Sequence, residues 1–179
     1  LNGNEEQKKK YLPKLASGEY LGAYSLSEAG SGTDAAAMVA RASEDGDVFT
    51  LNGEKMWVTN GTTADLFVLF AKVTDHPDYG KKNHGGVTCF IIEKGFEGFK
   101  IGKKEDKLGI RSSDTCTLIL DNCKVPKENV LGDVGKGFAI AMNALDNSRI
   151  GIAAQGLGIA QGAYEAAVKY SKERETFGK

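Results

Sequence analysis

The sequence predicts an α+β fold, in which an antiparallel β-barrel or sandwich-like middle domain is flanked by α-helical segments. Three observations support this prediction. Tight-turn dipeptides cluster in the middle section, β-branched and aromatic runs fill it, and helix signals occur only toward the two ends. No helical pattern of about ten or more residues interrupts the middle, which argues against a doubly wound sheet. We expect three segments, residues 1–20, 21–131 and 132–179.

The first expected element is a short helix over residues 5–15. Its acidic residues come first and its lysines follow, an order that favours the helix dipole. Pro13 and Gly18 are expected to end the helix. So short a helix must pack against another element to be stable.

The middle segment is expected to contain a β-meander. The dipeptides Asp45-Gly46, Asn52-Gly53 and Asn60-Gly61 occur close together, and Asn-Gly supplies the positive φ angles of a tight hairpin turn. Between and after these turns, strands are predicted at residues 48–51, 55–59, 66–71, 87–92 and 116–120.

The last segment is expected to hold two helices, over residues 138–149 and 153–174, separated near Gly151. In the second helix small residues recur at every fourth position, namely Ala154, Gly158, Gly162 and Ala166. Such a stripe lets another helix approach closely, which would offset the cost of about 0.5–1 kcal/mol for each helical glycine. We expect that neighbouring helix to lie outside this chain.

Charge and composition exclude several classes of function. The chain has 23 Lys and Arg residues against 24 Asp and Glu residues, for a net charge of −1. No basic nucleic-acid arm or polybasic membrane patch is therefore expected. The N-terminus lacks the apolar segment of a signal peptide, and no apolar run is long enough to span a membrane. The chain does not begin with Met, and we expect it to be part of a longer protein.

The cysteines and histidines suggest no metal site. Cys89, Cys116 and Cys123 are odd in number and lack C-x-x-C spacing, so we expect buried free thiols in a reducing compartment. His76 and His84 fall in a polar loop without a cluster of further ligands.

A glycine-rich loop, Gly30-Ser-Gly-Thr-Asp-Ala35, matches the dinucleotide fingerprint G-x-G-x-x-A. A Rossmann site requires a crossover helix next, whereas hairpin signals follow here, so that fold is not expected. The loop can still offer backbone N–H groups and hydroxyls to an anion. The alternative is an ordinary surface loop.

Three further patterns each have a functional and a structural interpretation. Strand alternation places Trp57 and Thr59 on one face, where a flat aromatic ligand could stack, although a lone Trp more often fills a β core. Asp146 and Arg149 are three residues apart on a helix and therefore share a face. They could form a structural ion pair, or they could contact a ligand. Arg174 and Phe177, at the end of the last helix, read by themselves as a solvated cap.

Taken in order, these segments resemble the acyl-CoA dehydrogenase family over essentially the whole chain. The loop at residues 24–34, Tyr-Ser-Leu-Ser-Glu-Ala-Gly-Ser-Gly-Thr-Asp, is similar to the family's flavin-binding signature, with departures at Ser25 and Ala29. The other matching stretches are residues 52–61, 107–115, 125–131, 145–150 and 173–179. The sequence of residues 145–161 is most similar to that of the short-chain, butyryl-type branch.

The resemblance implies a layout of helical, β and helical domains. Residues 1–20 would end the first, residues 21–131 would form the second, and residues 132–179 would begin the third. It implies FAD contacts from Tyr24, Leu26, Ser27, Gly32, Thr33, Trp57, Val58, Thr59, Arg174 and Phe177. Arg174 and Phe177 would reach the FAD of another subunit. Thr33, Asp146 and Arg149 would meet the acyl-CoA.

The implied reaction is α,β-dehydrogenation of an acyl-CoA thioester, with electrons passed to an electron-transfer flavoprotein. The family's catalytic Glu is expected beyond Lys179, so we nominate no catalytic residue. The resemblance also implies a homotetramer in the bacterial cytoplasm or the mitochondrial matrix. Two alternatives stay open: an acyl-CoA oxidase, which gives its electrons to oxygen, and a non-catalytic flavin- or CoA-binding module if the chain ends at Lys179.

Overall fold

The fold was analysed in a computed structural model that describes residues 1–178. The chain divides into two compact units, Leu1–Ala141 and Met142–Lys179, and each is described by itself. The division into residues 1–20, 21–131 and 132–179 stays a prediction.

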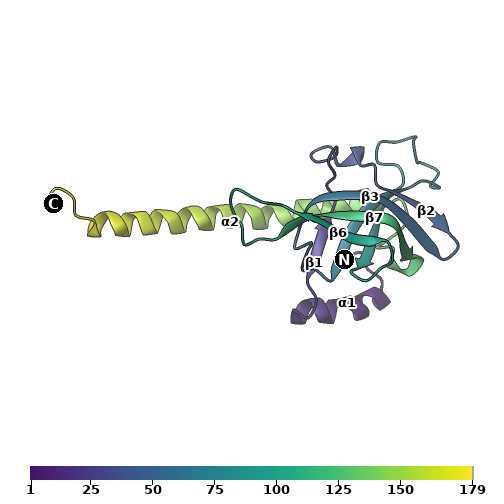
Figure 1. The fold of residues 1–179 in the computed structure, drawn as a ribbon, viewed down its shortest axis with the longest axis horizontal. Helices are drawn as coiled ribbons and strands as arrows, with labels where there is room; N and C mark the ends of the chain where they lie inside the picture. The colour runs from purple at the N-terminus through teal and green to yellow at the C-terminus, as the bar shows by residue number, and fades with distance from the viewer. Residues whose placement is uncertain (179) are drawn as a thin grey trace. The chain divides into compact units, whose positions relative to one another are not determined.

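The first unit contains one helix, seven strands and two short 3-10 helices, followed by the first residues of a long helix (Figure 1). In chain order the elements are α1 (Glu5–Ser17), β1 (Gly22–Ser25), η1 (Ala35–Ala37), β2 (Arg41–Asp45), β3 (Val48–Thr59), β4 (Leu66–Val73), β5 (Val87–Glu93), β6 (Phe99–Lys104), β7 (Thr115–Pro126), η2 (Lys127–Asn129) and α2 (Gly137–Glu173). The sequence prediction missed β1, β2 and β6, which are short or strongly polar.

The helix α1 is defined by its caps. The Asn4 side chain accepts a hydrogen bond from the Gln7 backbone N–H, and the Gln7 side-chain oxygen accepts one from the Asn4 backbone N–H. Gly18 closes the helix in the left-handed conformation. The expectation that Pro13 ends the helix was wrong, because it lies inside it. Tyr11 buries its ring against strands β4 and β5, which supplies the packing that so short a helix needs.

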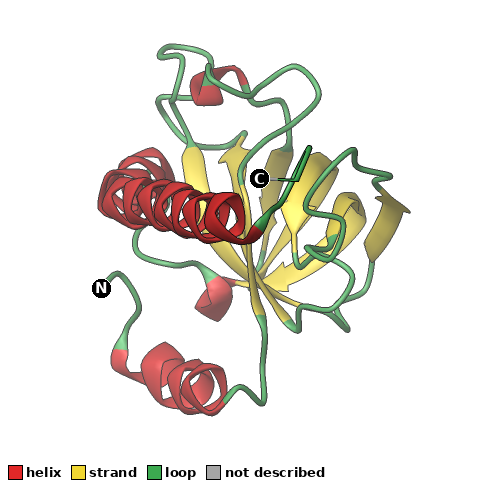
Figure 2. Ribbon diagram, turned by 90° about the vertical axis from the view of Figure 1, so that its left-hand side faces the viewer, coloured by secondary structure: helices red, strands yellow, loops and turns green. Residues whose placement is uncertain are grey.

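The strands form a single curled sheet in the order β1-β4-β2-β3-β7-β6, with β5 on β4 (Figure 2). The predicted α+β class is confirmed. Two pairings are parallel, however: β1 with the start of β4, and β2 with its end. Since β5 occupies the other edge of β4, the chain leaves the sheet after β1 and returns to the same edge at β2. Residues 26–40 form the loop between them.

Strand β3 is one continuous strand rather than a hairpin. The Asp45-Gly46 turn joins β2 to β3 as predicted. At Asn52-Gly53, however, the register with β7 shifts by a bulge. Gly53 has φ 141°, and a side chain there would approach the Ala40 Cα to 2.8 Å, so it serves close packing instead of a turn. The turn at Asn60-Gly61 leads to β4, which is not a neighbour of β3.

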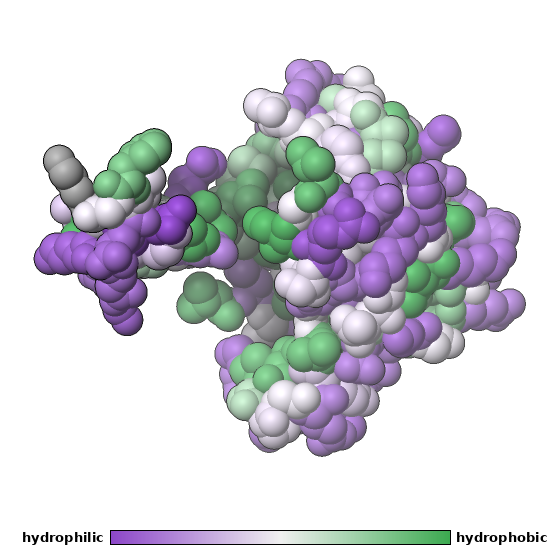
Figure 3. Space-filling model, turned by 60° about the vertical axis from the view of Figure 1, so that its left-hand side comes forward, coloured by the Kyte–Doolittle hydropathy of each residue, from purple (hydrophilic) through white to green (hydrophobic). Residues whose placement is uncertain are grey.

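The core lies inside the curled sheet. Phe49 packs edge-on against Phe90, and Phe67 lies against Phe99, with ring centroids 5.3 and 4.7 Å apart. All three cysteines are buried and free, as predicted. The visible surface of this unit is mainly hydrophilic, with separate apolar patches (Figure 3).

The helix α2 runs without interruption over Gly137–Glu173, so the predicted break near Gly151 was wrong. Its two helical patterns merge because isolated glycines are tolerated within a helix. Ala154, Gly158, Gly162 and Ala166 are exposed within the second unit. Across residues 1–178 we find no helix with the length and apolar character needed to cross a membrane.

Candidate functional site

The candidate site is built on the loop that leaves the sheet between β1 and β2. Glu28 and Ser31 exchange two backbone hydrogen bonds of 2.9 and 3.1 Å, which close the loop into a tight turn. The Ser31 hydroxyl then donates to the Asp34 carbonyl at 2.8 Å. These bonds leave Gly32 and Thr33 exposed at the surface of the loop.

This loop runs beside the second half of β3. The Met56 backbone N–H donates to the Ser27 carbonyl at 2.8 Å, and the Lys55 ammonium donates to the Leu26 carbonyl at 3.1 Å. Just after the end of β3, the Asn60 side-chain amide donates to the carbonyl of Gly22, the first residue of β1. The structure therefore brings the predicted residues of β1 and its loop next to those of β3.

Trp57 projects from the protein surface instead of filling the core. Its indole is 62% exposed and its backbone has φ 56°, at a second register shift between β3 and β7. Thr59 is also exposed, whereas Val58 is 1% exposed. Trp57 and Thr59 thus share the outer face, as alternation predicted, and the interpretation of Trp57 as a core residue was wrong. Only the backbone of Val58 can face a ligand here.

Tyr24 borders the same region. Its ring packs against Phe70 with centroids 5.3 Å apart, and its hydroxyl donates to the Ala141 carbonyl at 3.4 Å. Burial, with a smaller effect of Cys89, raises the pKa of the Tyr24 phenol to about 12. The phenol therefore stays neutral at physiological pH and remains a hydrogen-bond donor.

Several hydrogen-bonding groups on this surface have no partner in the described part of the chain, and a flat, polar, anionic ligand requires such groups. Within residues 1–178, the hydroxyls of Ser27, Thr33 and Thr59 make no side-chain hydrogen bond, and neither does the Trp57 indole N–H. An exposed indole can stack on a flat ring, and such an aromatic contact contributes about 0.5–1.5 kcal/mol beyond area burial. The donors suit flavin ring edges and phosphate oxygens, so the residues present fit an FAD.

A buried ion pair underlies this surface. Glu28 and Lys55 are 4% and 0% exposed, and the Lys55 ammonium lies 2.7 Å from the Glu28 carboxylate. Burial lowers the pKa of Lys55, an effect that the Glu28 charge opposes. Sequence reasoning missed this pair, although a lysine within an apolar strand and a glutamate within a glycine-rich loop were its visible signals.

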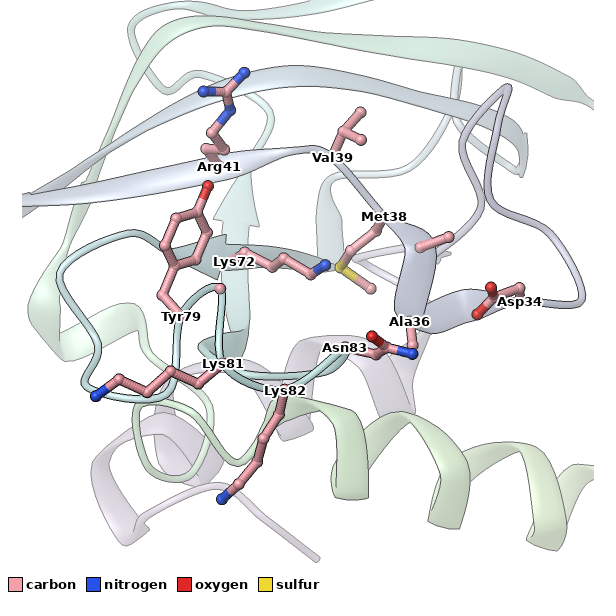
Figure 4. Close-up of a pocket in the computed structure, with 12 residues that line it drawn as sticks. Asp34, Ala36, Met38, Val39, Arg41, Lys72, Tyr79, Lys81, Lys82 and Asn83 are labelled. Atoms are coloured by element: carbon pink, nitrogen blue, oxygen red, sulfur yellow. The ribbon is translucent and has the colours of Figure 1, made fainter.

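A basic pocket of about 650 Å³ lies beside the loop (Figure 4). It is lined by Asp34, Ala36, Ala37, Met38, Val39, Arg41, Lys72, Tyr79, Gly80, Lys81, Lys82 and Asn83. In Figure 4 the Lys72 side chain extends across the pocket toward Met38, whereas Lys81 and Lys82 extend away from it. This pocket was also missed, since its cations come from separate elements.

The remaining predicted site residues belong to the second unit. There Asp146 and Arg149 form an exposed ion pair with an N–O distance of 3.3 Å. Arg174 donates to the Glu175 carbonyl, and Phe177 is exposed with φ 56°. Roles for these four residues in ligand binding stay predictions. Among the described residues, no three His, Cys, Asp or Glu side chains gather as a metal site would require.

Asp114 anchors the turn that follows Thr59. Its carboxylate accepts from the Thr62 backbone at 2.7 Å and from the Thr62 hydroxyl at 2.6 Å, and the side chain is 13% exposed. Burial alone would raise the pKa of Asp114, but the Thr62 hydrogen bonds outweigh it and hold the pKa below its usual value. The bonds stabilise the folded state at neutral pH.

We expect Asp114→Asn to lower the free energy of unfolding at pH 7 by about 1.5–3 kcal/mol, the value of hydrogen bonds to a charged group. Because the folded-state pKa is depressed, the wild-type advantage should disappear as the pH falls through about 4 and below. Urea unfolding at both pH values measures this. An equal difference at neutral and acidic pH would contradict the prediction.

Comparison with known proteins agrees with the family resemblance seen in the sequence. A family model for the acyl-CoA dehydrogenase middle domain matches residues 23–123, and one for the acyl-CoA dehydrogenase C-terminal domain matches residues 135–179. The short-chain specific acyl-CoA dehydrogenase of Clostridium acetobutylicum is 53% identical over 178 residues, covering 99% of this chain and 46% of that protein. The chain thus spans about half the length of the curated relatives it matches.

Solved structures of similar fold include the following two. One comes from a study of the electron transferring flavoprotein of Acidaminococcus fermentans and flavin-based electron bifurcation. It superposes with a TM-score of 0.91 at 53% identity, over 98% of this chain and 45% of that chain. The other is an acyl-CoA dehydrogenase from Bacillus anthracis complexed with FAD. Its TM-score is 0.92 at 43% identity, over 100% of this chain and 30% of that chain.

Proposed function

The chain belongs to the acyl-CoA dehydrogenase family, and from this premise we propose that the whole protein is an FAD-dependent dehydrogenase of short-chain acyl-CoA thioesters. The observation that carries the proposal is the outer face of β3, where an exposed Trp57 and an unpartnered Thr59 hydroxyl lie beside the glycine-rich loop. The name of the relative from Clostridium acetobutylicum supports the short-chain substrate.

FAD is the cofactor that these residues fit. Trp57 and Thr59 would flank its isoalloxazine ring, and Tyr24, Leu26, Ser27, Gly32 and Thr33 would follow its length. When bound, the flavin supplies the acceptor for the substrate's β-hydride. The Thr59 hydroxyl and backbone would donate to the ring edge and favour its acceptance of charge. Arg174 and Phe177 would contact the FAD of a second subunit, and we propose a homotetramer.

The acyl-CoA substrate has an anionic end, and the basic pocket is suited to bind it. Thr33 lies directly before Asp34 of the pocket lining, and we place the acyl-CoA along this loop. Lys72 would meet a phosphate of the nucleotide portion. Asp146 and Arg149 would contact the same ligand from helix α2.

The general base is not among the residues we assign. Glu28, the carboxylate of the loop, is buried and bound to Lys55, Val39 and Ala40, so it cannot reach an α-proton. We propose that a carboxylate beyond Lys179 performs this step. Electrons would leave to an electron-transfer flavoprotein, a partner supported by the structure from Acidaminococcus fermentans. The three free thiols fit a reducing site such as the bacterial cytoplasm or mitochondrial matrix.

The direct test is turnover of butyryl-CoA by the whole protein loaded with FAD, using an artificial electron acceptor. We expect enoyl-CoA formation that stops when the acceptor is omitted. Equal turnover under oxygen alone would identify an oxidase instead. Absence of both FAD binding and turnover would contradict the proposed function.

Trp57→Ala should weaken FAD binding about two- to twelvefold in the whole protein, since the lost stacking is about 0.5–1.5 kcal/mol. The free energy of unfolding should change little, because an exposed side chain is removed. Flavin absorbance and equilibrium titration measure the first effect, and urea unfolding of the apoprotein measures the second. An unchanged flavin spectrum with a large loss of stability would argue against the ring contact.

Lys72→Gln should raise the KM for butyryl-CoA about fivefold, or about 1 kcal/mol, and leave kcat unchanged. The reason is the loss of one cation facing the phosphates. A butyryl-pantetheine thioester, which lacks the nucleotide, should show no such change. Lys100→Gln removes an exposed charge on β6 that pairs with Asp121 and serves as the control. A similar rise in KM for both thioesters would exclude phosphate recognition by Lys72.

A further inference from the structure

We propose that the buried pair Glu28–Lys55 is a positioning device, which fixes the glycine-rich loop against strand β3 and thereby sets the geometry of the flavin ring site. The inference rests on the proposed function, because it concerns how that cofactor is held. It assigns a role to two side chains that touch no ligand themselves.

Glu28 joins three segments through one carboxylate. Its Oε2 accepts from the Val39 backbone at 2.6 Å, and its Oε1 accepts from the Ala40 backbone at 3.1 Å. The same Oε1 accepts from the Lys55 ammonium at 2.7 Å. The loop is therefore tied both to its own return into β2 and to β3.

Lys55 completes the connection from the other side. Besides Glu28, its ammonium donates to the Leu26 carbonyl at 3.1 Å. Leu26 and Ser27 belong to the stretch that we assign to the cofactor, and Ser27 accepts from Met56, the next residue of β3. Both carbonyls are thus held by adjacent residues of one strand.

The pair also lies at an irregularity in the pairing of β3 with β7. The register with β7 shifts between Lys55 and Val58, and within that shift Trp57 has φ 56°. Strand alternation would put Lys55 and Trp57 on one face, yet Lys55 is fully buried and Trp57 is exposed. Anchoring Lys55 inward is what lets the bulge turn Trp57 outward.

Stability alone does not explain such a pair. Removing two charges from water costs several kcal/mol for each ion, and apolar replacement of a buried pair is often neutral or stabilising. A buried pair that satisfies three backbone groups fixes geometry more strictly than apolar packing does. Those backbone groups, at Leu26, Val39 and Ala40, all belong to the loop, and Lys55 itself lies two residues before Trp57. The geometry that the pair fixes is therefore that of the loop against this part of β3.

The experiment uses the whole protein and three variants. The double variant Glu28→Gln/Lys55→Met removes both charges and keeps similar shapes. Glu28→Asp keeps the charge but withdraws the carboxylate by one methylene. Leu51→Ala, a buried residue in the other half of β3, is the matched control for disturbance of the core. Each is measured by thermal melting of the apoprotein, FAD dissociation constant and visible circular dichroism of the bound flavin.

We expect the double variant to melt within a few degrees of the wild-type apoprotein, to bind FAD at least tenfold more weakly and to alter the flavin circular dichroism. Glu28→Asp should show the same changes to a smaller degree. Leu51→Ala should lower the melting temperature yet leave the FAD dissociation constant and the flavin spectrum as in wild type. This opposite pattern separates positioning from stability.

The inference is overturned if the folded double variant binds FAD with wild-type affinity and spectrum. It is equally overturned if the double variant and Glu28→Asp both fail to fold, because the pair would then serve the fold itself. A wild-type protein that binds no FAD would instead refute the proposed function, and this is measured first.

Discussion

Glu28→Gln alone is expected to lower the free energy of unfolding by about 3–5 kcal/mol, which is a large share of the roughly 5–15 kcal/mol of a typical domain. The substitution leaves the Lys55 ammonium, which is 0% exposed, without its counter-charge. Breaking a buried pair costs far more than replacing both partners, because the remaining charge keeps its full desolvation penalty. The double variant with Lys55→Met should therefore be much more stable than the single one.

The pH dependence provides an internal check. Burial already lowers the pKa of Lys55, and removal of Glu28 leaves that effect unopposed. The unfolded chain then binds more protons than the folded one between the lowered folded-state pKa of Lys55 and the ordinary lysine pKa of about 10.4. The stability of Glu28→Gln should accordingly rise as the pH increases toward the ordinary lysine pKa of about 10.4, whereas the double variant should show no such rise. Urea unfolding across this range decides between a charge penalty and a general packing defect.

The fold class followed from the sequence because its signals are local. Turn dipeptides, apolar runs and the absence of a crossover helix all indicated a β-domain with helical ends, and the structure confirms it. Pairing could not be read in the same way. The parallel contacts of β1 and β2 with β4 depend on where the loop of residues 26–40 returns to the sheet.

Asn52-Gly53 illustrates the limit of turn signals. The dipeptide has the composition of a tight turn, yet β3 continues through it as a bulge. What decides the outcome is close packing of Gly53 on Ala40, a residue thirteen positions earlier that local sequence cannot identify. Tertiary packing thus overrides a local preference.

The candidate site was predictable in part. Alternation correctly placed Trp57 and Thr59 together on one face and Val58 on the other. The same rule fails at Lys55, because a bulge intervenes and reverses the side on which the side chain lies. The pocket around Lys72 escaped prediction since its lining comes from η1, β2, β4 and the loop after β4. Such sites need the topology first.

Gly61→Ala is expected to destabilise the protein by about 1–3 kcal/mol and to weaken FAD binding at the same time. A methyl group at this position would overlap the buried Cys116 Sγ and approach the Val58 carbonyl to 3.1 Å. Gly61 lies two residues after Thr59, in the turn at the end of β3. Relief of the clash must therefore move either Cys116 or the end of the strand that presents Thr59.

A double-mutant cycle with Cys116→Ala identifies which part moves. Cys116→Ala alone leaves a small void, and in its background Gly61→Ala has room for its methyl group, so we expect the double variant to recover at least about 1 kcal/mol relative to the sum of the singles. FAD affinity should recover with it, because the Thr59 backbone returns to its place. Gly95→Ala, where a methyl group would meet nothing within 4 Å, controls for glycine replacement in a loop. Additive effects of Gly61→Ala and Cys116→Ala would show that the strain lies elsewhere in the turn and that Cys116 does not set the position of Thr59.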